Sequence, residues 1–263
     1  MHAFKYHRPS SVNDAAKLAT GEAKLLAGGQ TLVQTMKLRL ASPSDIIDLG
    51  TIKDLAGIKS DGKSVTIGAM TRHAEVAHSA DVKKALPALA ALAGMIGDRQ
   101  VRNMGTLGGS LANNDPAADY PAAVLGLGAT ITTTKGTHAA DKFFKGLYET
   151  ALKPGEIITS VSFPVPKRAA YMKFKNQASR FAIVGVFVAD TGAGVRVAVT
   201  GAAPCVLRLA EMERALTAKF APESVASLKV KSDGLNSDLH ASAEYRAHLI
   251  TVMAKRAVEA AMK

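Results

Sequence analysis

The chain has 263 residues, of which 48% are hydrophobic and 21% charged, a composition typical of a folded globular protein with one large or two small domains. Its net charge of +11 is spread along the chain and is not interleaved with aromatic side chains, so we expect no nucleic-acid binding. A single cysteine, Cys205, excludes an internal disulfide and an iron–sulfur cluster held by this chain alone, and it fits a cytoplasmic location. No apolar stretch approaches the roughly 20 residues of a membrane-spanning helix.

The first fifty residues predict short strands and short helices in alternation. Ser11 stands in a capping pattern that predicts the start of a helix. Strands are expected at 24–27 and 45–49, where apolar residues run together. Between them, apolar residues spaced four apart over 32–40 predict a helical turn or two.

Residues 57–64 match the phosphate-binding pattern G-x-x-x-x-G-K-[ST], but the sequence around them does not fit a phosphate site. Segments 56–60 and 64–68 alternate as strands do, and Asp61-Gly62 between them suits a tight hairpin turn. A genuine loop of this kind opens a helix, whose amides meet the phosphates. We therefore predict a β-hairpin here and no ATP site.

The middle and the end of the chain differ in pattern. The middle predicts helices around 72–78, 82–96 and 117–126, followed by strands at 129–134 and 157–163. Pro164 and Pro166 come next, and we place a domain boundary there. The remainder predicts an antiparallel meander at 171–174, 183–188 and 195–201, followed by helices near 208–219 and from 242 to the end.

Two glycine segments are candidates for phosphate binding: Ala27-Gly28-Gly29-Gln30-Thr31 and Thr106-Leu107-Gly108-Gly109-Ser110. Backbone approaches a diphosphate closely only where side chains are missing. Each segment also has a simpler interpretation as a tight turn without a ligand, and taken alone neither excludes it. The second is not a Rossmann fingerprint, because G-x-G-x-x-G does not fit its spacing. Together, with no lysine in either, they indicate a dinucleotide held mainly by backbone.

Other polar residues add less. Asp115 is expected to cap a helix that begins at Pro116, which would leave Asp119 one turn inside it and able to accept a hydrogen bond from a sugar hydroxyl. His73 is expected on a helix surface, and Cys205 as a small buried residue. Neither zinc-ligand spacing nor a Ser-His-Asp arrangement is present, so we predict no metal ligand and no catalytic residue on this chain.

Long runs around both glycine segments resemble the FAD-binding medium subunits of the xanthine dehydrogenase and carbon monoxide dehydrogenase family of molybdenum hydroxylases. The resemblance is carried by residues 27–32, 36–43, 47–49, 96–103, 105–112, 115–119 and 201–204. It implies an α+β fold with a two-lobed FAD-binding domain of the vanillyl-alcohol-oxidase (PCMH) type at 1–166, with lobes at about 1–53 and 54–166. A small C-terminal α+β domain with an antiparallel sheet and helices would occupy 167–263.

The same resemblance implies which residues bind the cofactor. They are Ala27, Gly28, Gly29, Gln30, Thr31, Leu32, Val33, Gln34, Gly97, Thr106, Leu107, Gly108, Gly109, Ser110, Asn113, Asp119, Ile158 and Lys173, with Lys175 as the alternative to Lys173. The first segment would wrap the pyrophosphate, and the second would contact the flavin and the ribityl–phosphate region. Gly97 would pass near the ring, Ile158 would lie against the adenine, and Asp119 would bind a hydroxyl of the adenosine half.

The chain departs from the family pattern at a few positions. Gln34 stands where a proline is common, Met104 where an arginine is common, and Asn113-Asn114 replaces a more usual His-Ala pair. None of these changes removes a loop glycine. Met104 and Asn113 bear on how the flavin edge meets its electron acceptor.

By resemblance, the chain is the electron-transfer subunit of a hetero-oligomeric oxidoreductase. The [2Fe–2S] clusters of a small partner subunit would reduce its FAD, which would pass electrons to NAD, a quinone, O₂ or another acceptor. A large molybdopterin subunit would hydroxylate the substrate, and the expected assembly is a dimer of heterotrimers. The alternative is a free-standing FAD-dependent oxidase or reductase of the same fold. A non-catalytic nucleotide-binding module is the third hypothesis, which two intact glycine segments disfavour.

Overall fold

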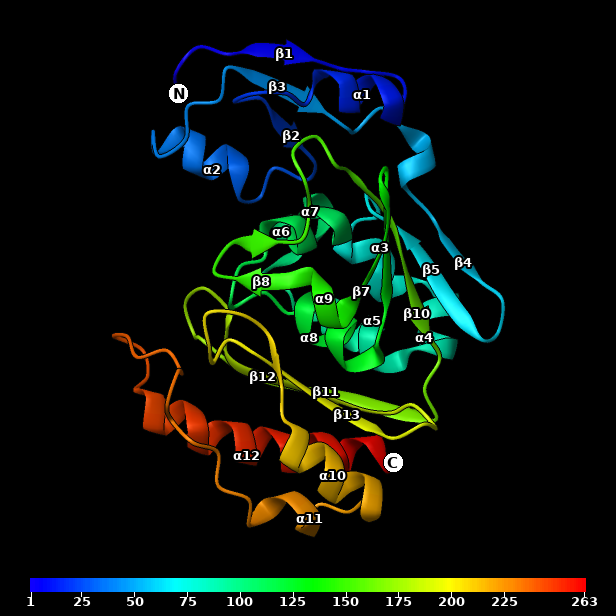
Figure 1. The fold of residues 1–263 in the computed structure, drawn as a ribbon, viewed down its shortest axis with the longest axis vertical. Coiled ribbons are helices and arrows are strands. Elements are labelled where there is room, and N and C mark those ends of the chain that lie inside the picture. The colour runs from blue at the N-terminus through cyan, green and yellow to red at the C-terminus, as the bar shows by residue number, and fades with distance from the viewer.

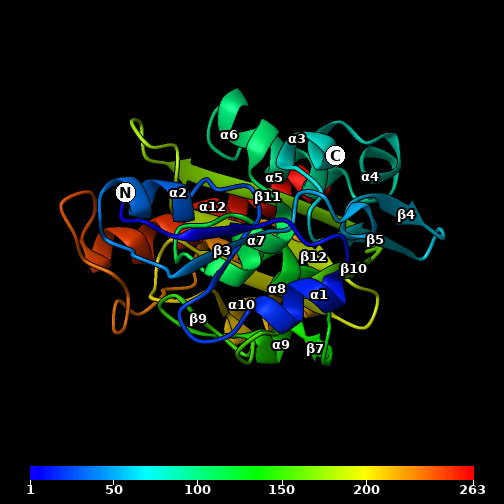
Figure 2. The same ribbon diagram turned by 90° about the horizontal axis from the view of Figure 1, so that it is seen from above.

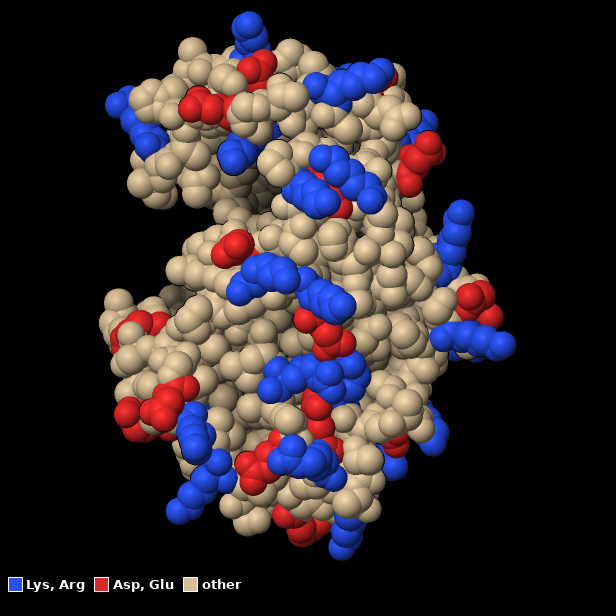
Figure 3. Space-filling view, viewed as in Figure 1, with Lys and Arg blue, Asp and Glu red and all other residues tan.

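The computed structural model describes residues 1–263 as an α+β molecule in which three sheets are stacked along the long axis (Figure 1). The N-terminal lobe lies at one end, a central sheet with its helices lies in the middle, and the C-terminal sheet and helices form the other end. Seen from above, the N-terminal lobe covers the middle of the body (Figure 2). Lysine and arginine side chains are scattered among acidic ones over the face in Figure 3. None of the helices combines the length and the apolar composition needed to span a membrane.

The N-terminal lobe is a small parallel sheet, in the order β1-β3-β2, with two helices. Its elements are β1 (Lys5–His7), α1 (Val12–Leu18), β2 (Lys24–Leu26), α2 (Leu32–Lys37) and β3 (Asp45–Asp48). The predicted cap of α1 is confirmed, because Ser11 Oγ accepts the N–H of Asp14 at 3.1 Å. The predicted helix after the first glycine segment is shorter than expected, since α2 ends before Arg39, which has a φ of 60°.

The central sheet has the order β4-β5-β10-β6-β7. Its strands, with the 3₁₀ turn that precedes them, are η1 (Lys53–Leu55), β4 (Ile58–Ser60), β5 (Ser64–Gly68), β6 (Thr130–Thr133), β7 (Gly136–Ala139) and β10 (Ile158–Pro164). The predicted hairpin is confirmed: β4 and β5 pair antiparallel, and Gly62 in the turn has a φ of 82°. The Asp61 carboxylate accepts hydrogen bonds from the N–H groups of Lys63 and Ser64, so these amides are not free to bind a phosphate. The segment continues as a strand and does not begin a helix.

Short helices cover the central sheet. They are α3 (His73–His78), α4 (Ala80–Ala85), α5 (Pro87–Gly94), α6 (Arg99–Met104), α7 (Leu107–Asn113), α8 (Tyr120–Leu127) and α9 (Ala140–Phe143), followed by the two-stranded ribbon of β8 (Phe144–Gly146) and β9 (Glu149–Thr150). The single helix predicted at 82–96 is wrong, because Leu86 leaves helical geometry and Pro87 begins a new helix. The second glycine segment is not a loop either: Gly108 and Gly109 lie in the first turn of α7.

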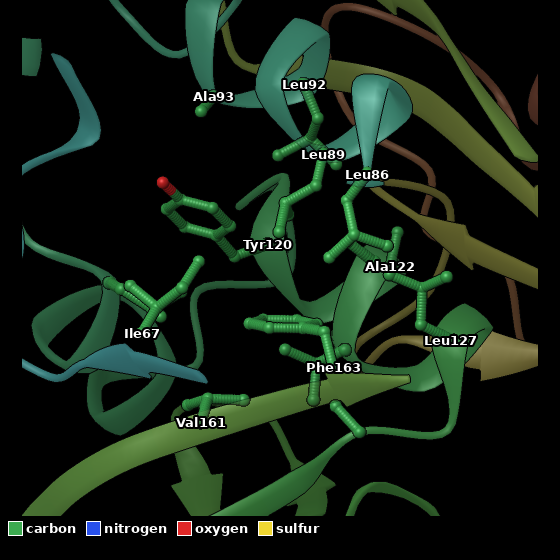
Figure 4. Packing of buried hydrophobic residues seen from close by; sticks show 14 of the residues in the cluster. Ile67, Leu86, Leu89, Leu92, Ala93, Tyr120, Ala122, Leu127, Val161 and Phe163 are labelled. Atoms are coloured by element: carbon green, nitrogen blue, oxygen red, sulfur yellow. The ribbon is translucent and has the colours of Figure 1, made fainter. Parts of the chain in front are cut away.

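The largest core lies between these helices and the central sheet, and it contains 32 buried residues. Figure 4 shows Leu89, Ala93 and Phe163 around the ring of Tyr120, with the Tyr120 hydroxyl pointing away from Phe163. Full burial of an aliphatic or aromatic side chain contributes roughly 1.5–3 kcal/mol. The position of Tyr120 at the start of α8 is therefore fixed by packing, and with it the segment that precedes α8.

The C-terminal part is the predicted antiparallel meander, extended by one short strand. Its elements are β11 (Arg168–Lys175), β12 (Ala182–Asp190), β13 (Val195–Thr200), β14 (Leu207–Arg208), α10 (Ala210–Ala218), α11 (Glu223–Ala226) and α12 (Ala243–Ala261). One face of this sheet packs on α12 and α10, and the other packs on α5 and α8. Met172 and Phe174 face the C-terminal core as predicted, which points the alternate residue Lys173 toward the central body. Helix α11 was not predicted.

Candidate cofactor-binding site

A cavity of about 600 Å³ lies between the N-terminal lobe and the central body. Its size falls within the ~300–1,000 Å³ typical of small-molecule sites. Both glycine segments line it, and so do residues of the β11–β12 connection, including Arg180 and Phe181. Figure 3 shows a notch between the upper lobe and the body, with few charged side chains in view inside it. The cavity is therefore built from segments that are distant in sequence.

The first glycine segment presents unused backbone donors. It leaves β2 at Leu26 and enters α2 at Leu32, with Gly29 at a φ of 70°. The consecutive N–H groups from Gly28 to Leu32 donate to no acceptor within the chain. A row of unpaired amides in a turn is a site for an anion, and the start of a helix adds to its positive potential. This segment has the chemistry of a phosphate cradle without a lysine or arginine in it.

The second glycine segment is different, because its amides are used inside the protein. The N–H of Gly108 donates to Ala69 O at 2.7 Å, and that of Gly109 donates to Thr106 Oγ1 at 3.2 Å. A Cβ on Gly108 would lie 2.5 Å from the Cβ of Ala69. Gly108 thus allows close packing of α7 against the turn that follows β5. Toward the cavity the segment offers the Ser110 hydroxyl, which has no partner in the chain.

The two segments meet at the wall of the cavity. A Cβ on Gly28 would lie 2.2 Å from Met104 O and 2.6 Å from the Cα of Gly105. A Cβ on Gly109 would lie 3.3 Å from the Cβ of Ala27. Contacts below 3 Å between carbon and backbone atoms are not tolerated, so Gly28 is required for the N-terminal lobe to approach the central body.

Most of the expected binding residues line this cavity. They are Ala27, Gly28, Gly29, Gln30, Thr31, Leu32, Gly97, Thr106, Gly108, Gly109, Ser110, Asn113, Asp119 and Ile158. The others do not reach it: Leu107 is buried in the central core, Val33 packs on Gly29, Gln34 is exposed on α2, and Lys173 lies behind Asp119. Lys175 is exposed at the end of β11.

Asp119 is held from both sides. Its Oδ1 accepts the Tyr171 hydroxyl at 2.5 Å, and its Oδ2 accepts Lys173 Nζ at 2.9 Å, with both charged side chains almost fully buried. Burial raises the pKa of Asp119, and Lys173 and Tyr171 act against that rise. The expected position of Asp119 one turn inside a helix is wrong, because α8 begins only at Tyr120. Asp115 likewise caps no helix and instead accepts the N–H of Ala117 at 2.9 Å.

His73 was expected on a surface, and this is wrong. It is only 5% exposed, it lines the cavity, and its Nδ1 has no hydrogen-bond partner. Burial, with a smaller contribution from the nearby Arg102, lowers the pKa of His73 to about 4, so the imidazole is neutral. A signal was present in the sequence, because Val76 and Ala77, one helical turn later, are apolar and share the buried face of α3.

Several further residues line the cavity but were not among the expected binding residues. Ile96, Val101 and Ile157 add apolar wall, which suits a planar ring. Arg180 donates to Gly97 O at 3.4 Å and places a cation at the edge of the cavity. Glu156, also in the wall, is buried and accepts hydrogen bonds from three groups within the chain.

The unpaired amides, the close glycine contact and the apolar wall fit a dinucleotide with a flat ring. Residues 2–166 match the family described as the FAD binding domain in molybdopterin dehydrogenase, and residues 169–261 match the CO dehydrogenase flavoprotein C-terminal domain. The chain belongs to this family. It is therefore an FAD-binding medium subunit of the molybdenum hydroxylases, and FAD is its cofactor.

Relatives of known function agree with this membership. The chain is 37% identical to the carbon monoxide dehydrogenase medium chain of Afipia carboxidovorans, over 98% of this chain and 96% of the relative. It is 36% identical to the nicotine 6-hydroxylase medium subunit of Paenarthrobacter nicotinovorans, over 97% and 96%. Its fold superposes on reconstituted CO dehydrogenase from Oligotropha carboxidovorans with a TM-score of 0.90, at 35% identity and covering 98% of this chain and 97% of that one. These relatives are subunits of oxidoreductases, and so is this chain.

Proposed function

We propose that this flavoprotein subunit accepts electrons from the [2Fe–2S] clusters of a small partner subunit and passes them to NAD, a quinone, O₂ or another acceptor. A large molybdopterin subunit would oxidise the substrate. The observation that carries the proposal is the run of free amides at Gly28–Leu32 facing a cavity whose buried carboxylates, Asp119 and Glu156, are both engaged by other groups. Such a cavity holds a cofactor, and neither of its buried carboxylates is free to act as a base toward a substrate. FAD supplies the redox chemistry when it is bound.

We propose that different residues of the chain bind different parts of the cofactor. The free amides of the first glycine segment hold the pyrophosphate, since they are the unpaired row of donors in the wall. Ile158 packs against the adenine, and Gly97 lies beside the flavin ring. The Ser110 hydroxyl and the Asn113 amide, which have no partner in the chain, donate to the cofactor from α7. Asp119 presents its carboxylate at the wall of the cavity, and the ammonium group of Lys173 balances its negative charge.

We also propose the organisation around this subunit. The boundary between the domains falls at residues 166 and 167, in the connection between β10 and β11, with lobes at about 1–53 and 54–166 in the first domain. The lone Cys205 cannot hold a cluster, which supports clusters on a partner chain and a reducing, cytoplasmic location. A dimer of heterotrimers is the assembly that we expect.

The test is to isolate the native complex through a tag on this chain and to quantify iron, molybdenum and FAD. We expect all three to copurify, and dithionite-reduced clusters to pass electrons to the flavin when the complex is reoxidised by an acceptor. A complex that carries Gly28→Ala should keep iron and molybdenum, lose FAD, and lose electron delivery to NAD or a quinone. A chain that purifies alone with FAD and oxidises a substrate without partners would support the free-standing enzyme instead.

A further inference from the structure

Two buried polar atoms next to the cavity have no hydrogen-bond partner. They are Nδ1 of His73 and the hydroxyl of Tyr120, on side chains that are 5% and 0% exposed. The two rings lie side by side, with centroids 5.2 Å apart. Leaving a buried polar group unpaired destabilises a protein, and such groups are few in native structures. Of the two residues, His73 lines the cofactor cavity, so its ring also borders the space that something outside the chain would fill.

The other imidazole nitrogen of His73 faces the place where the two glycine segments meet. A Cβ on Gly105 would lie 2.5 Å from His73 Nε2, so the absence of a side chain at Gly105 leaves this nitrogen uncovered. Gly105 in turn contacts Gly28 across the interface between the lobes. The backbone N–H of His73 donates to Gly105 O at 3.0 Å, which fixes the histidine in this position. Nε2 makes no hydrogen bond within the chain.

The protonation of His73 determines what Nε2 can do. The imidazole is buried among apolar residues and lies near Arg102, which disfavours the charged form, so it has one N–H donor and one acceptor. Nδ1 is buried and has no hydrogen-bond partner. A proton on Nδ1 would be a buried donor without an acceptor, whereas a group in the cavity can accept from Nε2, so the proton is best placed on Nε2. The histidine then presents a donor to the cavity.

We propose that His73 is a positioning residue for the cofactor, which donates a hydrogen bond from Nε2 to an acceptor atom of bound FAD where the two glycine segments meet. This inference rests on FAD binding in the cavity described above. The acceptor is an oxygen of the diphosphate or an oxygen or nitrogen of the flavin ring, which share the same chemistry toward a neutral donor.

The test is titration of the FAD-free full chain with FAD, followed by flavin fluorescence and absorption. We expect His73→Phe, which keeps a flat ring and removes the donor, to raise the Kd about threefold to tenfold, the change that follows the loss of one hydrogen bond. His73→Gln, whose amide nitrogen stands near the position of Nε2, should bind within about twofold of the unsubstituted chain. His78→Phe is the matched control, because His78 lies on the same helix and is exposed.

Two further arms identify the acceptor and guard against misfolding. If ADP binding weakens in the same proportion as FAD binding, the acceptor is on the diphosphate, and if only FAD binding weakens, with a shifted flavin absorption spectrum, it is on the ring. His73→Leu, which also removes the donor, should weaken FAD binding as the phenylalanine variant does, so the inference stays testable if the phenylalanine variant at position 73 fails to fold. The inference would be overturned if His73→Phe bound FAD as tightly as His78→Phe does. It would also be overturned if His73→Gln bound FAD no more tightly than His73→Phe. FAD binding as such would stand in either case.

Discussion

At the scale of single residues, Gly28 is where sequence and site are most tightly connected. Its missing side chain lets the backbone of the N-terminal lobe touch Met104 and Gly105 of the central body, and its own N–H is one of the free donors in the cavity. The sequence indicated that this glycine was needed for a close approach to a phosphate. The structure adds a second reason, which is a close approach to the other glycine segment. No property of the sequence near Gly28 identifies that distant neighbour.

We expect Gly28→Ala to weaken FAD binding by roughly tenfold or more, because the added carbon would overlap Met104 O and push the lobes apart. The measurement is the Kd for FAD of the full chain. Gly94→Ala is the matched control, since a Cβ there meets nothing closer than 4.0 Å, and it should bind FAD normally. Equal affinities of the two variants would show that the contact between the segments does not hold the site together.

His73 also gives the chain a dependence on pH. Unfolded histidine gains a proton below its ordinary pKa of 6.5, whereas His73 in the folded chain stays neutral until the pH nears about 4. Its contribution to the free energy of unfolding is therefore full above pH 6.5 and falls as the pH drops toward 4, by about 2 kcal/mol at pH 5. We expect the free energy of unfolding, measured in urea without FAD, to fall between pH 7.5 and pH 5 by about 2 kcal/mol less in His73→Gln than in the unsubstituted chain. Parallel losses in both proteins would contradict the buried, neutral state of His73.

At the scale of elements, a buried carboxylate in the turn before β10 holds part of the cavity wall in position. Glu156 accepts the Thr133 hydroxyl at 2.5 Å, His138 Nε2 at 2.8 Å and the N–H of Lys153 at 2.9 Å. Burial alone would raise the pKa of Glu156, but these bonds lower it to about 2. The carboxylate thus stays charged and fixes the turn that leads to Ile158. Its contribution to stability is present above the ordinary pKa and is lost only as the pH falls toward 2.

Removal of this carboxylate should be costly. We expect Glu156→Ala to lower the free energy of unfolding by about 2–4 kcal/mol at pH 7, because it removes the acceptor shared by three donors, of which only the Thr133 hydroxyl has another acceptor, Gly136 O. Glu22→Ala, at an exposed glutamate, should change it by less than about 0.5 kcal/mol. Urea unfolding of both variants checks this, and a loss at Glu156 no larger than at Glu22 would show that the turn is held by other contacts.

The elements that the sequence predicted well are those fixed by neighbouring residues. The hairpin at 58–68 follows from alternation and from Asp61-Gly62, and the cap of α1 follows from Ser11. Errors arose where tertiary packing decides. Gly108, predicted in a loop, lies in the first turn of α7 and packs against Ala69 in the turn after β5. Propensity alone cannot anticipate such contacts. The break at Pro87 is different, since it is a local signal that the predicted helix at 82–96 overlooked.

At the scale of the whole molecule, the site depends on how the three sheets are joined. The first segment comes from the N-terminal lobe, α7 comes from the central body, and Arg180 comes from the C-terminal sheet. Most of the residues that the family resemblance named line the cavity, but they make up fewer than half of its lining residues. Physical reasoning from the sequence could not group Ile96, Ile157 and Phe181, because nothing local relates them. The resemblance implied that Lys173 lies beside the cofactor, and neither it nor physical reasoning from the sequence anticipated that Lys173 balances Asp119 across the domain junction.

The buried pair of Asp119 and Lys173 joins the C-terminal sheet to the start of α8. We expect Lys173→Met to destabilise the whole chain by about 3–5 kcal/mol, since it leaves a buried carboxylate without its cation. Adding Asp119→Asn should recover part of that loss, so the double variant is more stable than the sum of the two single variants predicts. Thermal or urea unfolding of the set measures the coupling. Strict additivity would mean that the two charges do not stabilise each other.

The most direct test of the central claim is an experimental structure of the full chain with FAD. The account predicts one FAD in the cavity between the lobes, with its diphosphate on the amides of Gly28–Leu32 and part of the molecule against α7. A second cavity of about 610 Å³, lined by Lys84 and Lys167, lies elsewhere on the body and offers a clear alternative. FAD found there, or a diphosphate that makes no contact with the first glycine segment, would contradict the account.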